Sequence, residues 1–424
     1  MNTRAIELTP LVLLGITLVL LFLDIYAFKA IWIVIRTWKK PARRVATALY
    51  WAISLLLLVV LLSFTVFQYK SLDSIQRNAF LTLFAAAILT KVVVASFMLI
   101  DDLLRGATWL KRITRSRRAP KRSAASDLQQ SRSKFIAKTS LVVATAPAII
   151  LGGGIVRGGY RYELRKQRLV LPHLPTAFDG IRIIQLSDMH AGSLGDELAV
   201  RRGLELAMAQ RPDILFFTGD LVNYLYQEAT PFFKLLSELK APLGIYSVLG
   251  NHDYGDYWSF PNQQAKQANL TRLIAFQEAL GWKVLLNQHT YVRQGKDRLA
   301  IVGVENWGAV GHFPKYGRLD KAMKGCEAPI KLLLSHDPSH WDAEVRPKYP
   351  GIDVTFSGHT HGGQIGVSFG DYEWSPVKYL YDRWAGLYQE NQQYLYVNRG
   401  FGFNGYPGRL GIMPEITEVQ LNRT

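Results

Sequence analysis

The sequence predicts a layered α/β domain preceded by a module of membrane-spanning helices. Three observations support this prediction. Four long apolar segments occupy the first part of the chain, nearly all of the net positive charge lies in the same part, and short apolar strands alternate with helical patterns in the rest. A chain of 424 residues is long enough for two or three domains. We therefore expect a membrane module over 1–158 and a soluble domain over 159–424.

Four segments are long and apolar enough to cross a bilayer, which takes about 20 helical residues. They cover about 11–35, 45–67, 79–100 and 139–156. The fourth, "TSLVVATAPAIILGGGIV", is the shortest and is rich in small residues. The alternative for each segment is a buried core helix, and this alternative is strongest for the fourth.

Charge is distributed unevenly between the two parts. Residues 1–158 carry 22 Lys and Arg against 6 Asp and Glu, whereas residues 159–424 carry 28 against 27. Because the basic residues lie beside apolar runs, they indicate a membrane surface and not nucleic acid. The loops at 36–44, 68–78 and 101–138 hold five, two and eleven basic residues. This alternation predicts an outside N-terminus and an extracytoplasmic soluble domain, unless the fourth segment does not span.

Polar residues inside the membrane module need an explanation. Asp24, Lys29 and Lys91 fall within apolar spans, where ionisable groups are costly and often functional. We favour the alternative, in which they form internal ion pairs or extend toward a helix end. Residues 115–134 are polar and basic and contain no aromatic residue, so we expect a flexible basic linker near anionic headgroups.

Short apolar runs recur after residue 160. They lie at 181–186, 213–218, 244–249, 299–304, 330–335 and 352–356. Helical patterns such as 196–210 and 269–281 separate several of them. Nearly continuous apolar strands that alternate with helices are typical of a layered α/β fold.

Asp, Asn or His follows five of these strands, often beside a glycine. These residues are Asp188, His190, Asp220, Asn251, His336, His359 and His361. Because functional residues of α/β sheets gather at the carboxyl ends of strands, we expect them to form one site. Two carboxylates, one amide and four imidazoles suit Mn²⁺, Fe or Zn²⁺ better than Ca²⁺. Seven ligands exceed the needs of one ion, so the set predicts two ions that share a bridging carboxylate.

Five short motifs, in this order, resemble the signature of calcineurin-like metallophosphoesterases: DMH (188–190), GD (219–220), GNHD (250–253), His336 and GHTH (358–361). The resemblance covers about residues 165–424. The stretches "LPTAFDGIRIIQLSDMHAGS" and "YLYVNRGFGFNGYPGRLGIMPEI" resemble the membrane-linked branch, which includes phosphodiesterases considered for UDP-2,3-diacylglucosamine hydrolysis. The resemblance implies a four-layer α/β/β/α sandwich.

The resemblance also implies a role for each ligand. The first metal would be held by Asp188, His190, Asp220 and His361. The second would be held by Asp220, Asn251, His336 and His359, with Asp220 bridging. The cofactor would thus be two divalent ions, which can be Mn, Fe or Zn.

Two further pairs of residues are candidates for the site. His252 directly follows Asn251 and is not needed as a ligand, so we expect it to protonate the leaving group or stabilise the transition state. We expect Asp253 to orient the His252 ring, with turn capping as the alternative. Arg399 and Arg409 lie in a Gly- and Pro-rich closing loop, where either can hold a substrate phosphate or simply pack.

Together these features predict a membrane-anchored, binuclear metal-dependent phosphoesterase that hydrolyses phosphate ester or pyrophosphate bonds. Membrane anchoring favours a phosphorylated lipid or a nucleotide-linked substrate similar to UDP-2,3-diacylglucosamine. We expect membrane lipid as a partner, and we do not expect nucleic acid. The alternative is a non-catalytic membrane sensor or scaffold that keeps the fold. An intact set of seven ligands favours the enzyme.

Overall fold

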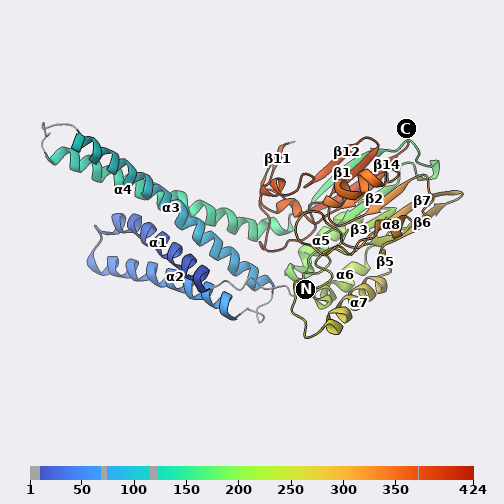
Figure 1. The fold of residues 1–424 in the computed structure, drawn as a ribbon, viewed down its shortest axis with the longest axis horizontal. Coiled ribbons are helices and arrows are strands. Elements are labelled where there is room, and N and C mark those ends of the chain that lie inside the picture. Colours follow the sequence, from blue (N-terminus) through green and yellow to red (C-terminus); the bar gives the residue numbers. More distant parts are fainter. Residues whose placement is uncertain (1–9, 68–73, 115–121, 371) are drawn as a thin grey trace. The chain divides into compact units, whose positions relative to one another are not determined.

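The computed structural model describes residues 10–67, 74–114, 122–370 and 372–424. The chain divides into two compact units, Met1–Gly152 and Gly153–Thr424. The first consists of long helices and the second of two β-sheets with covering helices (Figure 1).

The helical unit contains the long helices α1 (Pro10–Ile35), α2 (Lys40–Phe67), α3 (Ser74–Thr114) and α4 (Arg122–Arg157), of which α4 continues into the second unit. Four segments of these helices are long and apolar enough to cross a membrane: Leu14–Ile35, Lys40–Val59, Thr82–Leu110 and Arg132–Tyr160. Many of their apolar side chains are exposed, such as Leu56 and Phe135, as expected for helices that face lipid. The helical unit therefore integrates the chain into a membrane.

Asp24, Lys29 and Lys91 form internal ion pairs, the interpretation that we favoured. Lys91 Nζ lies 2.5 Å from Asp24 Oδ1, and Ser54 Oγ donates a hydrogen bond of 2.7 Å to the same oxygen. Lys29 Nζ lies 2.5 Å from the carboxylate of Asp102. Asp24 and Asp102 thus each have a basic partner on another helix.

The expected flexible linker at 115–134 is helical from Arg122 onward, and residues 115–121 lie outside the described residues. The buried carboxylate of Asp101 in α3 contacts the end of this stretch. Its Oδ2 accepts hydrogen bonds from Arg105 Nε at 2.8 Å and from Ser133 Oγ of α4 at 2.9 Å. Arg132 Nη2 lies 3.4 Å from the other oxygen. These contacts join α3 to α4 at Arg132 and Ser133, which composition alone does not indicate.

The α/β unit is built on two six-stranded sheets. The first has the order β1 (Glu163–Val170), β14 (Glu415–Asn422), β2 (Arg182–Leu186), β3 (Ile214–Phe217), β4 (Ile245–Ser247) and β5 (Lys283–Val284). The second has the order β12 (Gly386–Glu390), β13 (Gln393–Val397), β9 (Val354–Ser357), β8 (Lys331–Leu334), β7 (Asp297–Gly303) and β6 (Gln288–Gln294). Each expected strand is present.

Alternating side chains show that these sheets form a four-layer sandwich. Phe216 points into a core shared by both sheets, whereas the next residue, Phe217, packs under helices. Leu332 and Leu333 alternate in the same way in the second sheet. Helices α5 (Glu197–Met208), α6 (Phe233–Ser237) and α7 (Gln263–Ala279) cover the first sheet, and α8 (Leu319–Met323) covers the second (Figure 1). The predicted α/β/β/α fold class is confirmed.

Strand direction positions the candidate site. In the first sheet β2, β3 and β4 run parallel, and in the second sheet β8 and β9 run parallel. The carboxyl ends of parallel neighbours meet at one edge. The loops that follow these five strands carry the seven candidate ligands.

Candidate metal centre

Most of the candidate ligands have an unusual backbone conformation. The angle φ is positive at Asp188 (53°), His190 (47°), Asp220 (56°), His359 (70°) and His361 (52°). Non-glycine residues adopt this left-handed region rarely, and such residues cluster at functional sites. The loops accept this conformation at the positions where it turns these side chains toward one point.

Glycines allow the loops to approach one another closely. A Cβ atom on Gly250 would lie 2.2 Å from Asp220 Oδ1, and one on Gly358 would lie 2.2 Å from Asp188 Oδ2. Because both distances are far below van der Waals contact, any other residue would displace a carboxylate. This is the physical reason for the glycine that begins each of the motifs GNHD and GHTH.

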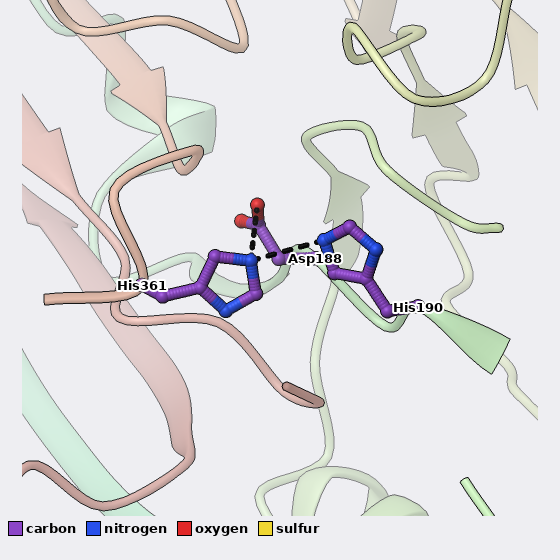
Figure 2. A group of neighbouring side chains, drawn as sticks. All are labelled: Asp188, His190 and His361. Carbon is purple, nitrogen blue, oxygen red and sulfur yellow. Dashed lines mark hydrogen bonds and ion pairs between the residues drawn. The ribbon is translucent and has the colours of Figure 1, made fainter. Parts of the chain in front are cut away.

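The first cluster consists of Asp188, His190 and His361, whose side chains point toward one another (Figure 2). His361 Nε2 lies 3.0 Å from His190 Nε2 and 3.4 Å from Asp188 Oδ1. Burial lowers the pKa of His190 to about 3 and holds the pKa of His361 well below its usual range. Neutral imidazoles have a lone pair to offer, so the cluster has the character of a cation site.

The second cluster consists of Asp220, His336 and His359. Asn251 Oδ1 joins it, at 2.8 Å from His359 Nδ1 and 3.2 Å from His336 Nε2. Asp220 Oδ2 lies 3.2 Å from His336 Nε2 and 3.5 Å from His190 Nε2 of the first cluster. This carboxylate therefore lies between the two clusters.

The electrostatics of the site fit a divalent cation. Burial raises the pKa of Asp188 to about 6. Burial would also raise the pKa of Asp220, but the charges of His336 and His252 hold it well below its usual range. Burial likewise opposes a charge on His336, yet Asp220 raises the pKa of this histidine to about 10. Two buried carboxylates thus draw positive charge into the site, and N and O donors of this kind fit divalent ions.

Hydrogen bonds from outside the clusters orient the candidate ligands. His336 Nδ1 donates to the carbonyl of Thr218 at 2.7 Å, which leaves Nε2 to face the cluster. His190 Nδ1 lies 2.9 Å from Asn223 Oδ1, and His359 Nε2 lies 2.8 Å from Tyr381 Oη. Neither of these partners, Asn223 and Tyr381, was predicted from the sequence. The one feature of the sequence that could have indicated Asn223 is its position three residues after Asp220.

His252 lies beside both clusters. Its backbone N–H donates to Asp220 Oδ1 at 2.8 Å, and its ring packs edge-on against His190 with centroids 4.8 Å apart. Ring Nδ1 donates to the carbonyl of Asn223 at 2.9 Å, and the Asn404 amide lies 3.1 Å from ring Nε2. The ring is half-buried and therefore remains accessible.

Asp253 does not orient the His252 ring as expected. Its carboxylate accepts hydrogen bonds of 2.9 Å from the backbone N–H groups of Asp220, Leu221 and Gly250. Asp253 therefore ties two ligand loops together, which is the capping alternative. The groups that contact the His252 ring nitrogens are instead Asn223 and Asn404.

The two arginines of the closing loop follow the packing alternative, because both are buried and have internal partners. Arg399 Nη1 lies 2.6 Å from Glu415, and its other terminal nitrogen pairs with Glu373. Arg409 donates to the carbonyls of His361 at 2.9 Å and Gly400 at 3.1 Å. These guanidinium groups hold the closing loop and are not directed to a substrate phosphate.

Two family models match this chain. The model described as "Probable Calcineurin-like phosphoesterase, transmembrane domain" matches residues 9–159. The model described as "Calcineurin-like phosphoesterase" matches residues 181–363, which contain all seven candidate ligands.

Several relatives match across much of the chain. A transmembrane protein with metallophosphoesterase domain from Danio rerio is 26% identical over 322 residues, which cover 74% of this chain and 67% of the relative. The Bacillus subtilis metallophosphoesterase YkuE is 28% identical over 306 residues, which cover 70% and 99%. The UDP-2,3-diacylglucosamine pyrophosphatase LpxG of Chlamydia trachomatis is 27% identical over 282 residues, which cover 54% and 81%.

Proposed function

Because this chain belongs to the calcineurin-like phosphoesterases and carries their transmembrane domain, we propose that it uses two divalent ions to hydrolyse a lipid-linked phosphate ester or pyrophosphate. Membership in this family makes the chain a metal-dependent hydrolase. The number of ions and the substrate class are our proposal. The position of Asp220 between the two clusters is the observation on which the two-ion proposal rests.

We assign the ligands from the two clusters. The first ion would be held by Asp188, His190, Asp220 and His361, and the second by Asp220, Asn251, His336 and His359. The donor set fits Mn, Fe or Zn. Divalent ions held there would supply the Lewis acidity that neutralises phosphoryl charge and activates water for attack.

His252 would handle the proton of the leaving group. The hydrogen bond from Nδ1 to the Asn223 carbonyl fixes the ring plane. Nε2, beside the amide of Asn404, is then the ring nitrogen that can exchange a proton. The half-buried ring is placed within one residue of the candidate ligand Asn251, where a leaving oxygen would be released.

A lipid-linked substrate is supported by two observations. The helical unit integrates the chain into a membrane, where lipids are concentrated. One relative is named as a pyrophosphatase of UDP-2,3-diacylglucosamine, which is a nucleotide-linked lipid. We therefore propose a phosphorylated lipid or a nucleotide-linked lipid as the substrate.

The two-ion proposal can be tested with the full chain in lipid nanodiscs. After treatment with a chelator, the protein would be titrated with Mn²⁺, Zn²⁺ or Fe²⁺, and bound metal would be counted by mass spectrometry. We expect two ions per chain and a parallel rise in hydrolysis of bis-p-nitrophenyl phosphate. Full activity with one bound ion would contradict the proposal.

From the alternation of basic loops we propose an extracytoplasmic α/β unit. A C-terminal fusion to alkaline phosphatase should then be active, while a fusion to a fluorescent protein that matures only in the cytoplasm should be dark. The opposite pattern would place the α/β unit in the cytoplasm, where nucleotide-linked lipids are expected.

A further inference from the structure

Five large apolar side chains are exposed close together after the GHTH motif. The strands β10 (Val367–Phe369) and β11 (Tyr372–Trp374) pair antiparallel, and the short helix η7 (Pro376–Tyr379) follows. The exposed side chains, which we call the hairpin patch, are Val367 (52%), Phe369 (84%), Tyr372 (62%), Tyr379 (73%) and Leu380 (69%). Among the described residues of the α/β unit, the other exposed large apolar side chains lie singly, at Val170, Leu198, Phe233 and Tyr257.

Hydrogen bonds hold the residues between the members of the hairpin patch. Ser375 is buried and donates a hydrogen bond of 2.9 Å to the carbonyl of Ile365. Trp374 Nε1 lies 3.5 Å from Tyr379 Oη and links β11 to η7. A soluble surface seldom leaves apolar side chains grouped in this way unless they bind something.

Strand β11 also forms an ion pair with the first strand of the α/β unit. The last apolar span ends at Tyr160, and β1 begins at Glu163. Arg165 of β1 lies 2.7 Å from Glu373 of β11. From Tyr160 to Arg165 an extended chain reaches at most about 18 Å. The ion pair therefore tethers β11 to a strand that begins three residues after the last apolar span ends.

The composition of the hairpin patch suits a lipid interface. Tyrosine and tryptophan favour the headgroup level, where one end of the ring is apolar and the other is hydrated. Lys378 is exposed within the same segment, and its Nζ lies 5.5 Å from the ring centre of Tyr379. A lysine beside apolar side chains can bury its stem and keep its charge among headgroups.

We propose that the hairpin patch inserts into the headgroup and acyl boundary of the membrane that the chain spans, and so fixes the α/β unit on the bilayer surface. The occupant is the bilayer because four membrane-spanning helices and a short connection hold the domain there. A consequence follows for the site. Leu380 precedes Tyr381, whose hydroxyl lies 2.8 Å from His359, so insertion would bring the metal centre to headgroup level. This consequence rests on the proposed function, but the insertion does not.

The test uses fluorescence quenching in nanodiscs. In a Cys326→Ser background, which removes the single native cysteine, a cysteine would replace Phe369 in one variant and Val170 in another. Val170 is the matched control, because it is exposed and lies at the far end of β1. Each cysteine would carry an environment-sensitive dye, and lipids with a doxyl group near the headgroup would quench it.

We expect doxyl lipids to quench the dye at position 369 several-fold more than the dye at position 170. Equal quenching at both positions would show that the hairpin patch is in water and would overturn the proposal. A dye at position 369 that is protected from aqueous iodide but not quenched by doxyl lipids would mean that protein covers it, which also overturns the proposal. Because no activity is measured, failure here is distinguishable from failure of the proposed hydrolysis.

Discussion

Both units of this protein bury charged groups, but they balance the charge differently. In the helical unit, Asp24 is paired with Lys91 and Asp102 with Lys29. In the α/β unit, the partners found for Asp188 and Asp220 within the described residues are histidines. A lysine supplies a full compensating charge, whereas burial lowers the pKa of His190 and His361 and so keeps these imidazoles neutral. Of the three histidines only His336 has a raised pKa, which is caused by Asp220. The ion pairs of the helical unit are therefore complete without a ligand, whereas the two clusters of the α/β unit are balanced by a cation.

The difference matters because an uncompensated buried charge is costly. A pair that is closed on itself contributes to packing and leaves no group free to bind a ligand. Carboxylates that converge with neutral imidazoles are costly in the free protein, and a metal ion offsets that cost when it binds. Buried charge alone thus does not identify a binding site, but an unbalanced set of donors does.

The largest expected effect is at Asp220. Asp220→Asn should lower metal content and hydrolysis by at least about 100-fold, because the loss of an outer-shell partner alone costs about 10–100-fold. Metal counting and hydrolysis of bis-p-nitrophenyl phosphate would measure this. Asp320→Asn is the matched control, because Asp320 is exposed and pairs with Arg318. If the variant retained two ions and near-parental activity, Asp220 would not be a metal ligand, and the contrast between the two units would be wrong.

A smaller effect is expected at His252. His252→Ala should slow hydrolysis of an alkyl phosphate ester by about 10²–10⁴-fold, the usual range for a positioned proton donor, with both metals retained. A p-nitrophenyl ester should be affected less, because its leaving group needs no proton. His173→Ala, at an exposed histidine, serves as the control. An equal loss on both esters would indicate a transition-state hydrogen bond in place of acid catalysis.

The balance in the helical unit can be tested by removing one charge and then both. Lys91→Met should destabilise the helical unit by about 3 kcal/mol, because Asp24 would be buried without its partner. Adding Asp24→Asn should restore most of that loss, which thermal unfolding in detergent micelles would measure. Lys138→Met, at an exposed lysine, is the control. A single variant as stable as the double variant would show that the pair does not balance charge.

The smallest effect is expected at the rim of the metal centre. The Asn251 amide donates a hydrogen bond of 2.9 Å to Tyr257 Oη, which turns Oδ1 toward His336 and His359. Tyr257→Phe should weaken binding of the second ion by about 10-fold. Competition with a metal-sensitive dye would measure this, and Tyr379→Phe provides a matched control at an exposed tyrosine. Unchanged affinity would show that the amide needs no outer partner.

Much of the fold and of the site was predictable because the signals are local. The apolar runs of β2, β3, β4, β8 and β9 and the length of the spans are properties of neighbouring residues. The seven candidate ligands were recognised because each lies in the loop that follows a strand. Parallel strands bring such positions together whatever the rest of the chain does.

Only the tertiary structure decided which groups those residues contact. Asp253 contacts loop amides instead of His252, and Arg409 binds the carbonyl of His361, which is 48 residues away in sequence. The basic stretch is helical after Arg122, and Ser133 at its end donates a hydrogen bond to Asp101 on another helix. A sequence pattern reports periodicity along the chain. The partner of a buried polar group is set by distant segments, because packing must satisfy every hydrogen bond that burial removes from water.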